Sequence, residues 1–537
     1  MASVPKETVL DALIVGAGFG GVYQLKHLRD AGYKVKLVDF ASDYAGVWYW
    51  NRYPGARVDS AVPLYQFSDP DLWNEWNWSQ RFPGSQELRD YFTFVADKWD
   101  LRKDTEFKVY ISKATWDDET ATWTIESGGG KIYRAKYFLL NTGFAAKRYT
   151  PDWKGIDKFP ASAWVHPSYW PKEEPDLTGK RVAVIGTGST GIQLAQELSQ
   201  VASQFVLFQR TPNMALPMKQ VNYTKPLTKE KYPKVFDGRY ESFGGFDFSF
   251  LFLPRGTFDD TPAEREMVYE GLWSQGDFQF WLATYSDTLF QEAANKEAYN
   301  FWKKKVRARI HDPRLQEILA PETQPYSFGC KRISLENGFY EIFNQPNVSL
   351  VDVNATPIVE VTERGIKTTE KEWEFDYVVC ATGFDAITGG LMNINIQGQG
   401  GQKIAEKWKS GAKTYLGMAT AGFPNMFFTY GPQAPTALCN GPTCAEAQGS
   451  FILKVMDHMK ERKLQKVEAG NTAEAAWGDD VRKFANMSLL PSTKSWYMGD
   501  NIPGKPRECL IYLGGVPNYY KSLKECSEGD YTGFTFT

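Results

Sequence analysis

Two glycine-rich motifs in this 537-residue chain have the spacing of dinucleotide-binding turns. Their glycines are Gly16, Gly18 and Gly21 in the first motif and Gly186, Gly188 and Gly191 in the second. In such a turn the first glycine permits a tight bend, the second lets backbone N–H groups approach a pyrophosphate, and the third lets the helix pack on the strand. The start of the helix also favours negative charge. The two motifs therefore predict two bound dinucleotides.

The residue at the end of the next strand distinguishes the two nucleotides. After the first motif this residue is Asp39, which is placed to accept hydrogen bonds from a ribose and would repel a ribose phosphate. The first site is therefore predicted to hold FAD or NAD. After the second motif stand Arg210 and Thr211. A guanidinium can pair with a 2′-phosphate, so the second site is predicted to take NADPH, although a surface ion pair is the alternative role for Arg210.

Each motif lies in a strand–turn–helix context that positions its glycines. Residues 9–15 and 181–185 are predicted strands that enter the turns, and residues 22–30 and 192–199 are the predicted helices that follow them. The hydrophobic pattern predicts a further helix over 85–99 and strands over 107–114, 122–126, 131–140, 348–351, 358–361 and 377–380.

A threonine–glycine–phenylalanine turn follows each of the strands that end at residues 140 and 380. Such turns are typical of passages between nucleotide domains. The predicted fold is α/β, with two nested Rossmann-like domains. The FAD-binding domain comprises residues 1–145 and 386–537, and the NADP-binding domain comprises 146–222 and 327–385. Residues 223–326 are predicted to be a helical insertion, with a capping box at 261–264 and an amphipathic stretch that ends at Asp312 and Pro313.

Composition limits the classes of partner. The formal net charge is −3, which argues against nucleic acid or an anionic membrane as the main partner. No run of about 18 apolar residues occurs, and residues 1–7 lack the apolar core of a signal peptide. We therefore expect a soluble, cytoplasmic protein.

The six cysteines form no C-x-x-C pair, and only four histidines are present. This pattern predicts free thiols, no structural zinc, no dithiol redox centre and no metal site.

A segment after the first motif carries a second, longer pattern. Its residues are Ala45, Gly46, Trp48, Tyr53, Pro54, Gly55 and Asp59. In this pattern the chain resembles the single-chain Baeyer–Villiger monooxygenases that use FAD and NADPH, and the resemblance extends over nearly the whole chain. A second fingerprint of that family is matched by Phe159, His166, Trp170 and Pro171. There the sequence departs from the pattern, because Ala161 replaces a glycine and the Phe159–His166 spacing is one residue longer.

The resemblance implies a reaction in which NADPH reduces FAD, O2 forms a flavin peroxide, and the peroxide converts a ketone to an ester or lactone. Arg332 is the implied catalytic cation, and Asp59 is implied to hold it in position. A guanidinium suits that role because it stays charged and offers several donors in a fixed fork. Lys331 is implied to join Arg210 on the 2′-phosphate, and Trp496 to contact NADP from a late loop.

The remaining site residues are carried over from the same family. The implied FAD residues are Gly16, Gly18, Phe19, Gly21, Asp39, Val47, Trp48, Trp50, Asp59 and Tyr65. The implied NADP residues are Arg57, Asp59, Gly186, Thr187, Gly188, Ser189, Thr190, Gly191, Gln193, Arg210, Thr211, Lys331, Arg332 and Trp496. Thr436, Ala437, Leu438 and Cys439 are implied to lie near the ketone.

Three other classes of protein are alternatives. A disulfide reductase shares the two-motif layout but needs a redox cysteine pair near the flavin, and none is present. A flavin monooxygenase that oxidises nitrogen or sulfur is the main alternative, and a flavoprotein that only binds nucleotide is the third. The sequence specifies neither the ketone nor the oligomeric state, and it is compatible with a monomer.

Overall fold

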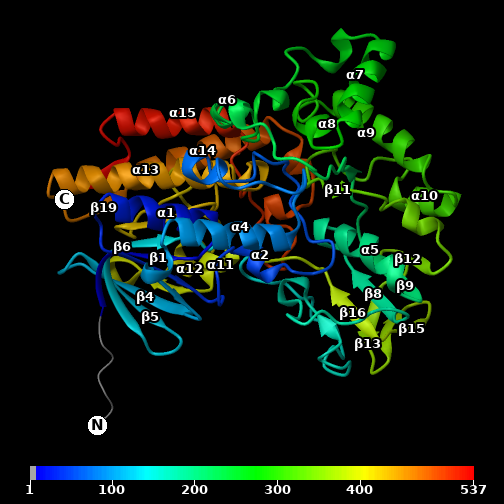
Figure 1. The fold of residues 1–537 in the computed structure, drawn as a ribbon, viewed down its shortest axis with the longest axis horizontal. Helices are drawn as coiled ribbons and strands as arrows, with labels where there is room; N and C mark the ends of the chain where they lie inside the picture. The colour runs from blue at the N-terminus through cyan, green and yellow to red at the C-terminus, as the bar shows by residue number, and fades with distance from the viewer. Residues whose placement is uncertain (1–7) are drawn as a thin grey trace.

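The computed structural model describes residues 8–537 and contains two large sheets (Figure 1). In the first sheet, β1 (Thr8–Val15) lies between β6 (Ile132–Leu140) and β2 (Val35–Asp39), parallel to both. Its other strands are β3 (Thr105–Phe107), β4 (Ile111–Asp117), β5 (Thr122–Ser127), β17 (Asn395–Gln397) and β18 (Met426–Phe428). Ala12, Leu13 and Ile14 of β1 are fully buried, as expected for a central parallel strand covered on both faces.

The second sheet is parallel throughout and has five strands. In spatial order they are β12 (Val348–Asp352), β9 (Gln204–Gln209), β8 (Arg181–Ile185), β16 (Tyr377–Cys380) and β7 (Trp164–Val165). An antiparallel meander connects β12 to β16 and consists of β13 (Ile358–Val361), β14 (Gly365–Thr368) and β15 (Glu372–Glu374). Helix α5 (Ser189–Val201) packs on β8 and β9.

Each sheet receives its nucleotide turn from its own strand–helix pair. β1 leads into α1 (Phe19–Asp30), and β8 leads into α5. In Figure 1, α1 and α13 (Gly441–Glu461) lie side by side above the first sheet. The remaining helices of this part are α2 (Val47–Trp50), α3 (Pro70–Trp73), α4 (Ser85–Lys98), α11 (Gly389–Met392), α12 (Ile404–Lys407), α14 (Asn471–Asn486) and α15 (Gly515–Glu528). The strands β19 (Val467–Ala469) and β20 (Phe534–Phe536) pair near the end of the chain.

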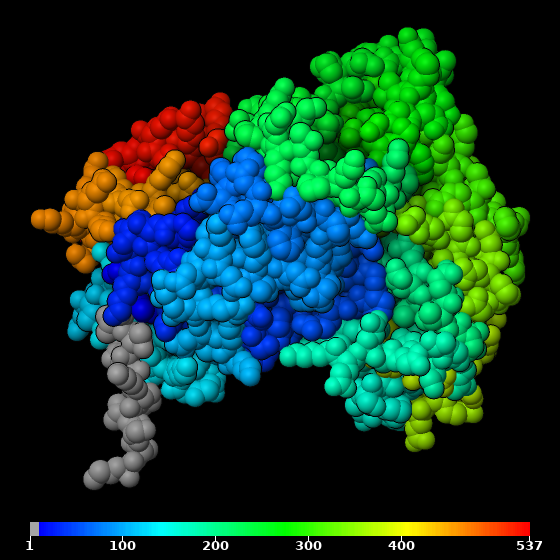
Figure 2. All heavy atoms as spheres, viewed as in Figure 1, coloured from blue at the N-terminus to red at the C-terminus, as the bar shows by residue number. Residues whose placement is uncertain are grey.

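A helical segment is inserted into the part of the chain that forms the second sheet. Its two ends meet where β10 (Leu216–Pro217) pairs with β11 (Leu335–Glu336). Its helices are α6 (Tyr232–Gly238), α7 (Pro262–Ser274), α8 (Gln279–Leu282), α9 (Glu292–Arg307) and α10 (Pro313–Leu319). Figure 2 shows this green segment at the top of the molecule, while the lower edge is indented between the blue and the teal segments.

The predicted fold class is confirmed, since both nucleotide motifs lie in Rossmann-type strand–turn–helix units. Both helices begin three residues before their predicted starts, at Phe19 and Ser189, because the last glycine of each motif lies inside the first helical turn. The capping box is also confirmed: the Thr261 hydroxyl accepts from the Glu264 N–H, and the Glu264 side chain accepts from the Thr261 N–H.

Two boundary predictions were wrong. The single strand predicted over 107–114 is divided into β3 and β4, because Lys108 has a φ of 60° and ends the extended backbone. Asp312 and Pro313 begin α10 and do not end α9; Asp312 accepts from the Arg314 N–H as the N-cap. Proline suits the first turn of a helix, where its missing N–H costs nothing.

The structure bears on the predictions that the chain has no membrane-spanning segment and that its cysteines are free thiols. None of the helices within residues 8–537 combines the length and apolarity that crossing a bilayer requires. All six cysteines are free, as predicted, and the structure shows that all six are buried. The expectation that residues 1–7 carry no signal peptide lies outside the described residues.

Candidate functional site

The first glycine turn is too tight for any larger residue. Gly16 has a φ of 108°, and a Cβ on it would lie 2.3 Å from the Asn141 carbonyl oxygen. A Cβ on Gly21 would lie 1.8 Å from the Gly16 carbonyl oxygen, so α1 packs directly on the turn. Asn141 follows β6 as Gly16 follows β1, and the two parallel strands therefore end at one edge of the sheet. This edge is where such folds bind nucleotides.

Asp39 lies at the same edge, at the end of β2. Its carboxylate accepts hydrogen bonds from the Ala17 N–H at 2.6 Å and the Ala41 N–H at 2.7 Å. Burial raises the pKa of Asp39, and the two N–H donors oppose that rise. The donors fix the carboxylate beside the glycine turn, and each oxygen keeps a lone pair that a ribose hydroxyl can use. The position fits the adenosine half of FAD.

Aromatic side chains gather around this turn. Phe19 contacts Tyr65 edge to face at 5.2 Å between ring centroids, and the Trp48 indole N–H donates to the Tyr65 hydroxyl at 3.0 Å. Trp50 stacks on Phe40, which follows Asp39, at 5.8 Å. Val47 opens α2 and is exposed. The predicted FAD residues are therefore close together around one edge of the first sheet.

The second glycine turn repeats the first and leaves an open cradle. Gly186 has a φ of 111°, and a Cβ on it would lie 2.4 Å from the Ala381 carbonyl oxygen. A Cβ on Gly188 would meet no atom within 4 Å, so the turn is open on that side. A pyrophosphate fits such a cradle.

Several side chains after Gly186 are already bonded within the protein. The Thr187 hydroxyl donates to the Thr211 carbonyl at 2.6 Å, and Ser189 bonds to Ser334 at 2.8 Å. The Gln193 amide donates to the Arg57 carbonyl at 3.0 Å. The Tyr53 hydroxyl donates to the Gln193 side-chain oxygen at 2.8 Å and lies 3.2 Å from the Thr190 hydroxyl. These residues would therefore hold a nucleotide mainly through backbone N–H groups, while Gln193 joins the two nucleotide-binding parts of the chain.

Lys331 and Arg210 place two positive charges close together. Burial and the neighbouring Arg210 lower the pKa of Lys331 to about 8, an effect that Asp500 partly opposes. The Lys331 ammonium lies 4.5 Å from the centre of the Tyr326 ring. A lowered lysine pKa beside a second cation is typical of a site that receives an anion. The pair fits a 2′-phosphate, as predicted for NADPH.

Arg332 and Asp59 come together from segments far apart in the sequence. The Nη2 atom of Arg332 donates to the Asp59 carboxylate at 2.5 Å, and its Nη1 atom donates to the Ala437 carbonyl at 2.6 Å. The guanidinium also lies over the Phe278 ring at 5.5 Å. Burial alone lowers the pKa of Arg332, but Asp59 together with Tyr497 and Tyr430 outweighs it, so the net shift is upward and the side chain stays charged. One fixed cation therefore faces the substrate segment.

The segment Thr436–Cys439 is buried around this cation. The Thr436 hydroxyl donates to the Gly431 carbonyl at 2.7 Å, so it stabilises its own loop. Tyr430 donates to the Cys439 carbonyl at 2.7 Å, and Cys439 packs against Cys444. Of the four predicted substrate residues, Ala437 is thus the one bonded directly to Arg332.

The late loop, residues 495–506, is held against both threonine–glycine–phenylalanine turns. The Trp496 ring stacks on Phe144 at 5.5 Å with an interplanar angle of 5°. Asn501 donates to the Phe384 carbonyl at 2.7 Å, and Lys505 donates to Asp385 at 2.9 Å. Phe144 and Phe384 are the phenylalanines of the two threonine–glycine–phenylalanine turns. Phe144 and Phe278 were not predicted as site residues; the turn that contains Phe144 was the available signal, and nothing in the sequence marks Phe278.

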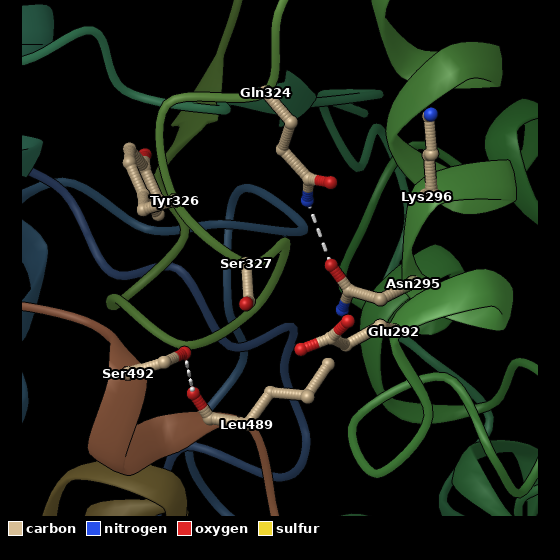
Figure 3. A pocket seen from close by; sticks show the side chains of 8 residues that line it. All are labelled: Glu292, Asn295, Lys296, Gln324, Tyr326, Ser327, Leu489 and Ser492. Atoms are coloured by element: carbon tan, nitrogen blue, oxygen red, sulfur yellow. Dashed lines mark hydrogen bonds between the residues drawn. The ribbon is translucent and has the colours of Figure 1, made fainter.

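Two cavities are lined in part by residues described above. One of about 260 Å³ is lined by side chains of α9, of residues 324–327 before Lys331, and of Leu489 and Ser492 (Figure 3). In it, Gln324 donates to Asn295 at 2.7 Å and Ser492 to the Leu489 carbonyl at 2.7 Å. The other, of about 200 Å³, has Arg57 and Gln193 in its wall. Neither cavity is lined by Arg332 or Asp59.

His166, in the segment that follows β7, contacts the second threonine–glycine–phenylalanine turn. Its Nε2 lies 3.0 Å from the Gly383 carbonyl oxygen, and its Nδ1 accepts from the Ser168 N–H. Burial lowers the pKa of His166 to about 4, with a smaller lowering by Arg148. A neutral ring with its proton on Nε2 satisfies both contacts. The family fingerprint residue is therefore structural here, despite Ala161.

We expect this histidine to make the protein less stable in acid. Because the pKa is about 4 in the folded protein and about 6.5 when unfolded, the unfolded state binds more protons between these values. The free energy of unfolding should therefore fall by up to about 3 kcal/mol as pH drops from 6.5 to 4. Thermal unfolding of the wild type and of His166→Asn at pH 7.5 and 5.0 measures this loss of stability. The Tm difference between the two proteins should be smaller at pH 5.0 than at pH 7.5. An equal gap at both pH values would contradict it.

Comparisons with known proteins agree with this geometry. A family model described as pyridine nucleotide-disulphide oxidoreductase matches residues 10–230. The chain is 47% identical to the cyclopentanone 1,2-monooxygenase of Comamonas sp., over 98% of this chain and 96% of that protein. It is 36% identical to the Baeyer–Villiger monooxygenase of Pseudooceanicola batsensis, over 97% and 95%. The crystal structure of the OTEMO complex with FAD and NADP matches with a TM-score of 0.93 at 33% identity, over 98% and 99%.

Proposed function

This chain belongs to the Baeyer–Villiger monooxygenases, FAD- and NADPH-dependent enzymes that convert ketones to esters or lactones, and we propose that its substrates are small cyclic ketones. The name of the cyclopentanone 1,2-monooxygenase, at 47% identity, supports this class of ketone. The Arg332–Asp59 ion pair bonded to Ala437 is the observation that carries the function, because it sets a fixed cation against the substrate segment.

Arg332 stabilises charge on the ketone in this account. Bound FAD, reduced by NADPH, supplies the activation of O2 for attack on the ketone carbonyl. As the carbonyl carbon is attacked, the carbonyl oxygen gains negative charge. The guanidinium uses one N–H on Asp59 and one on Ala437, and its other N–H groups remain to donate to that oxygen. Asp59 fixes the orientation of the fork, so no reorganisation is needed during reaction.

The remaining residues bind the two nucleotides. The glycine turn at Gly16 and Gly18 and the carboxylate of Asp39 hold FAD in this proposal, and Gly188, Arg210 and Lys331 hold NADPH. We propose that the chain divides into an FAD domain (1–145 and 386–537), an NADP domain (146–222 and 327–385) and an insertion (223–326). The pairing of β17 and β18 with the first sheet supports the return of the chain to the FAD domain.

We further propose that O2 is the co-substrate and that the enzyme works in the cytoplasm. Six free, buried cysteines suit a reducing compartment.

Product analysis tests the proposed function. The holoenzyme is incubated with NADPH and either cyclopentanone, cyclohexanone or thioanisole, and products are identified by gas chromatography. We expect the corresponding lactone from at least one cyclic ketone, with NADPH consumed in equal amount. Sulfoxide formation with no lactone from either ketone would instead indicate a heteroatom-oxidising enzyme.

A further inference from the structure

The backbone around Arg81 lies along the segment that carries Asp59. The Val62 N–H donates to the Arg81 carbonyl at 2.9 Å, and the Val58 N–H donates to the Pro83 carbonyl at 3.2 Å. Both donors belong to buried residues. Asp59 stands between them in the sequence, so one short stretch of chain fixes the backbone on both sides of this carboxylate.

The side chain of Arg81 holds a different segment, in the helical insertion. Its guanidinium pairs with the Asp277 carboxylate at 2.5 Å and donates to the Gln275 carbonyl at 2.8 Å. Asp277 also accepts from the Gln279 N–H at 2.8 Å. The Asp277 side chain is only 5% exposed, and a carboxylate so buried depends on its charged partner. Arg81 therefore fixes the turn between Gln275 and Gln279.

Phe278 is the residue at the centre of this turn, and its ring faces Arg332. The side chain is 1% exposed, and the Arg332 guanidinium lies 5.5 Å from the centre of the ring. Trp281 and Phe246 contact the same ring edge to face, at 5.4 and 6.3 Å between centroids. An aromatic ring at this distance attracts a guanidinium and restricts its orientation. Arg332 is thus held by the Asp59 carboxylate and by the Phe278 ring.

We propose that Arg81 is a positioning residue for Arg332, since its backbone holds the Asp59 segment and its side chain holds Phe278 through Asp277. Asp59 and Phe278 come from separate parts of the chain, and Arg81 joins these parts. The orientation of the catalytic cation therefore depends on an arginine that touches neither the flavin nor the ketone. This role rests on the proposed function, because it concerns attack on a ketone bound at Arg332.

The variant Arg81→Ala releases the insertion turn and leaves the backbone bond to Val62 available. In the FAD-bound enzyme, kcat for lactone formation per bound flavin should fall about 10-fold, since a displacement of about 1 Å can cost about 100-fold. KM for NADPH should stay unchanged, because Arg210 and Lys331 bind the 2′-phosphate separately. Arg81→Lys, whose ammonium can still pair with Asp277, should recover part of the lost rate.

A double-mutant cycle with Phe278→Leu determines whether Arg81 acts through the ring. In the Phe278→Leu background, loss of the Arg81 side chain should lower kcat by no more than about twofold, because the ring that it positions is already absent. An equal fall in both backgrounds, or wild-type kcat in Arg81→Ala, would overturn the role of Arg81. If Arg81→Ala gave no FAD-bound protein, Asp277→Asn would replace it in the cycle, with the same outcomes deciding.

Arg265→Ala is the matched control for a weakened insertion. The Arg265 side chain is 13% exposed, against 20% for Arg81, and it pairs with Glu297 of α9 at 3.5 Å. It also donates to the Asp260 carbonyl at 2.8 Å, so it joins elements within the insertion itself. This control should keep wild-type kcat per bound flavin, and a fall equal to that of Arg81→Ala would contradict the proposal. If the wild type itself made no lactone, the proposed function would fail first, so the two failures are distinguishable.

Discussion

Replacing Arg332 by alanine is expected to lower lactone formation at least about 100-fold while FAD remains bound. The reason is that the guanidinium is the cation fixed by Asp59 and Ala437 against the substrate segment. The glycine turn and Asp39 are separate from it, so flavin content should not change. Steady-state lactone formation and the flavin absorbance of the purified variant measure the two effects.

Arg29→Ala is the control for loss of an arginine–aspartate pair. Arg29, on α1, pairs with Asp104. The exposed fractions of these two side chains, 21% and 30%, resemble the 25% and 23% of Arg332 and Asp59. This variant should keep wild-type activity. Lactone formation at the wild-type rate by Arg332→Ala would remove Arg332 from the mechanism.

The second large effect concerns the choice of nucleotide. Arg210→Ala should raise KM for NADPH roughly 10- to 100-fold, since hydrogen bonds to a charged group contribute about 1.5–3 kcal/mol. KM for NADH should change little, because NADH has no 2′-phosphate. The depressed pKa of Lys331 beside Arg210 supports this assignment.

Arg364→Ala provides the comparison for this variant. Arg364 is an exposed arginine of the meander between β13 and β14 and pairs with Glu372 and Glu374. It should leave both KM values unchanged. If the ratio of KM for NADPH to KM for NADH in Arg210→Ala equalled that of the wild type, the 2′-phosphate would have to bind elsewhere.

Local pattern was sufficient to predict the parts of the fold that bind nucleotides. Strand, glycine turn and helix are adjacent in sequence, so Gly16 and Gly186 could be placed in their turns before any tertiary contact was known. The break at Lys108 could not be predicted in this way, because a positive φ leaves the apolar alternation around it unchanged.

The candidate site shows the same limit. Asp59, Arg332 and Ala437 are far apart in the sequence, and the resemblance alone suggested that the first two meet. The bond from Arg332 to the Ala437 carbonyl depends on how the loops pack. Phe278 escaped prediction because its contact with Arg332 across the fold, and not any local motif, gives it its place in the site.

Isotope labelling tests the central claim most directly. The holoenzyme is turned over with NADPH, a cyclic ketone and ¹⁸O2, and the lactone is analysed by mass spectrometry. One ¹⁸O atom, located in the ring, is expected in each lactone molecule. Lactone without label, or consumption of NADPH and O2 that yields only hydrogen peroxide with every ketone, would contradict it.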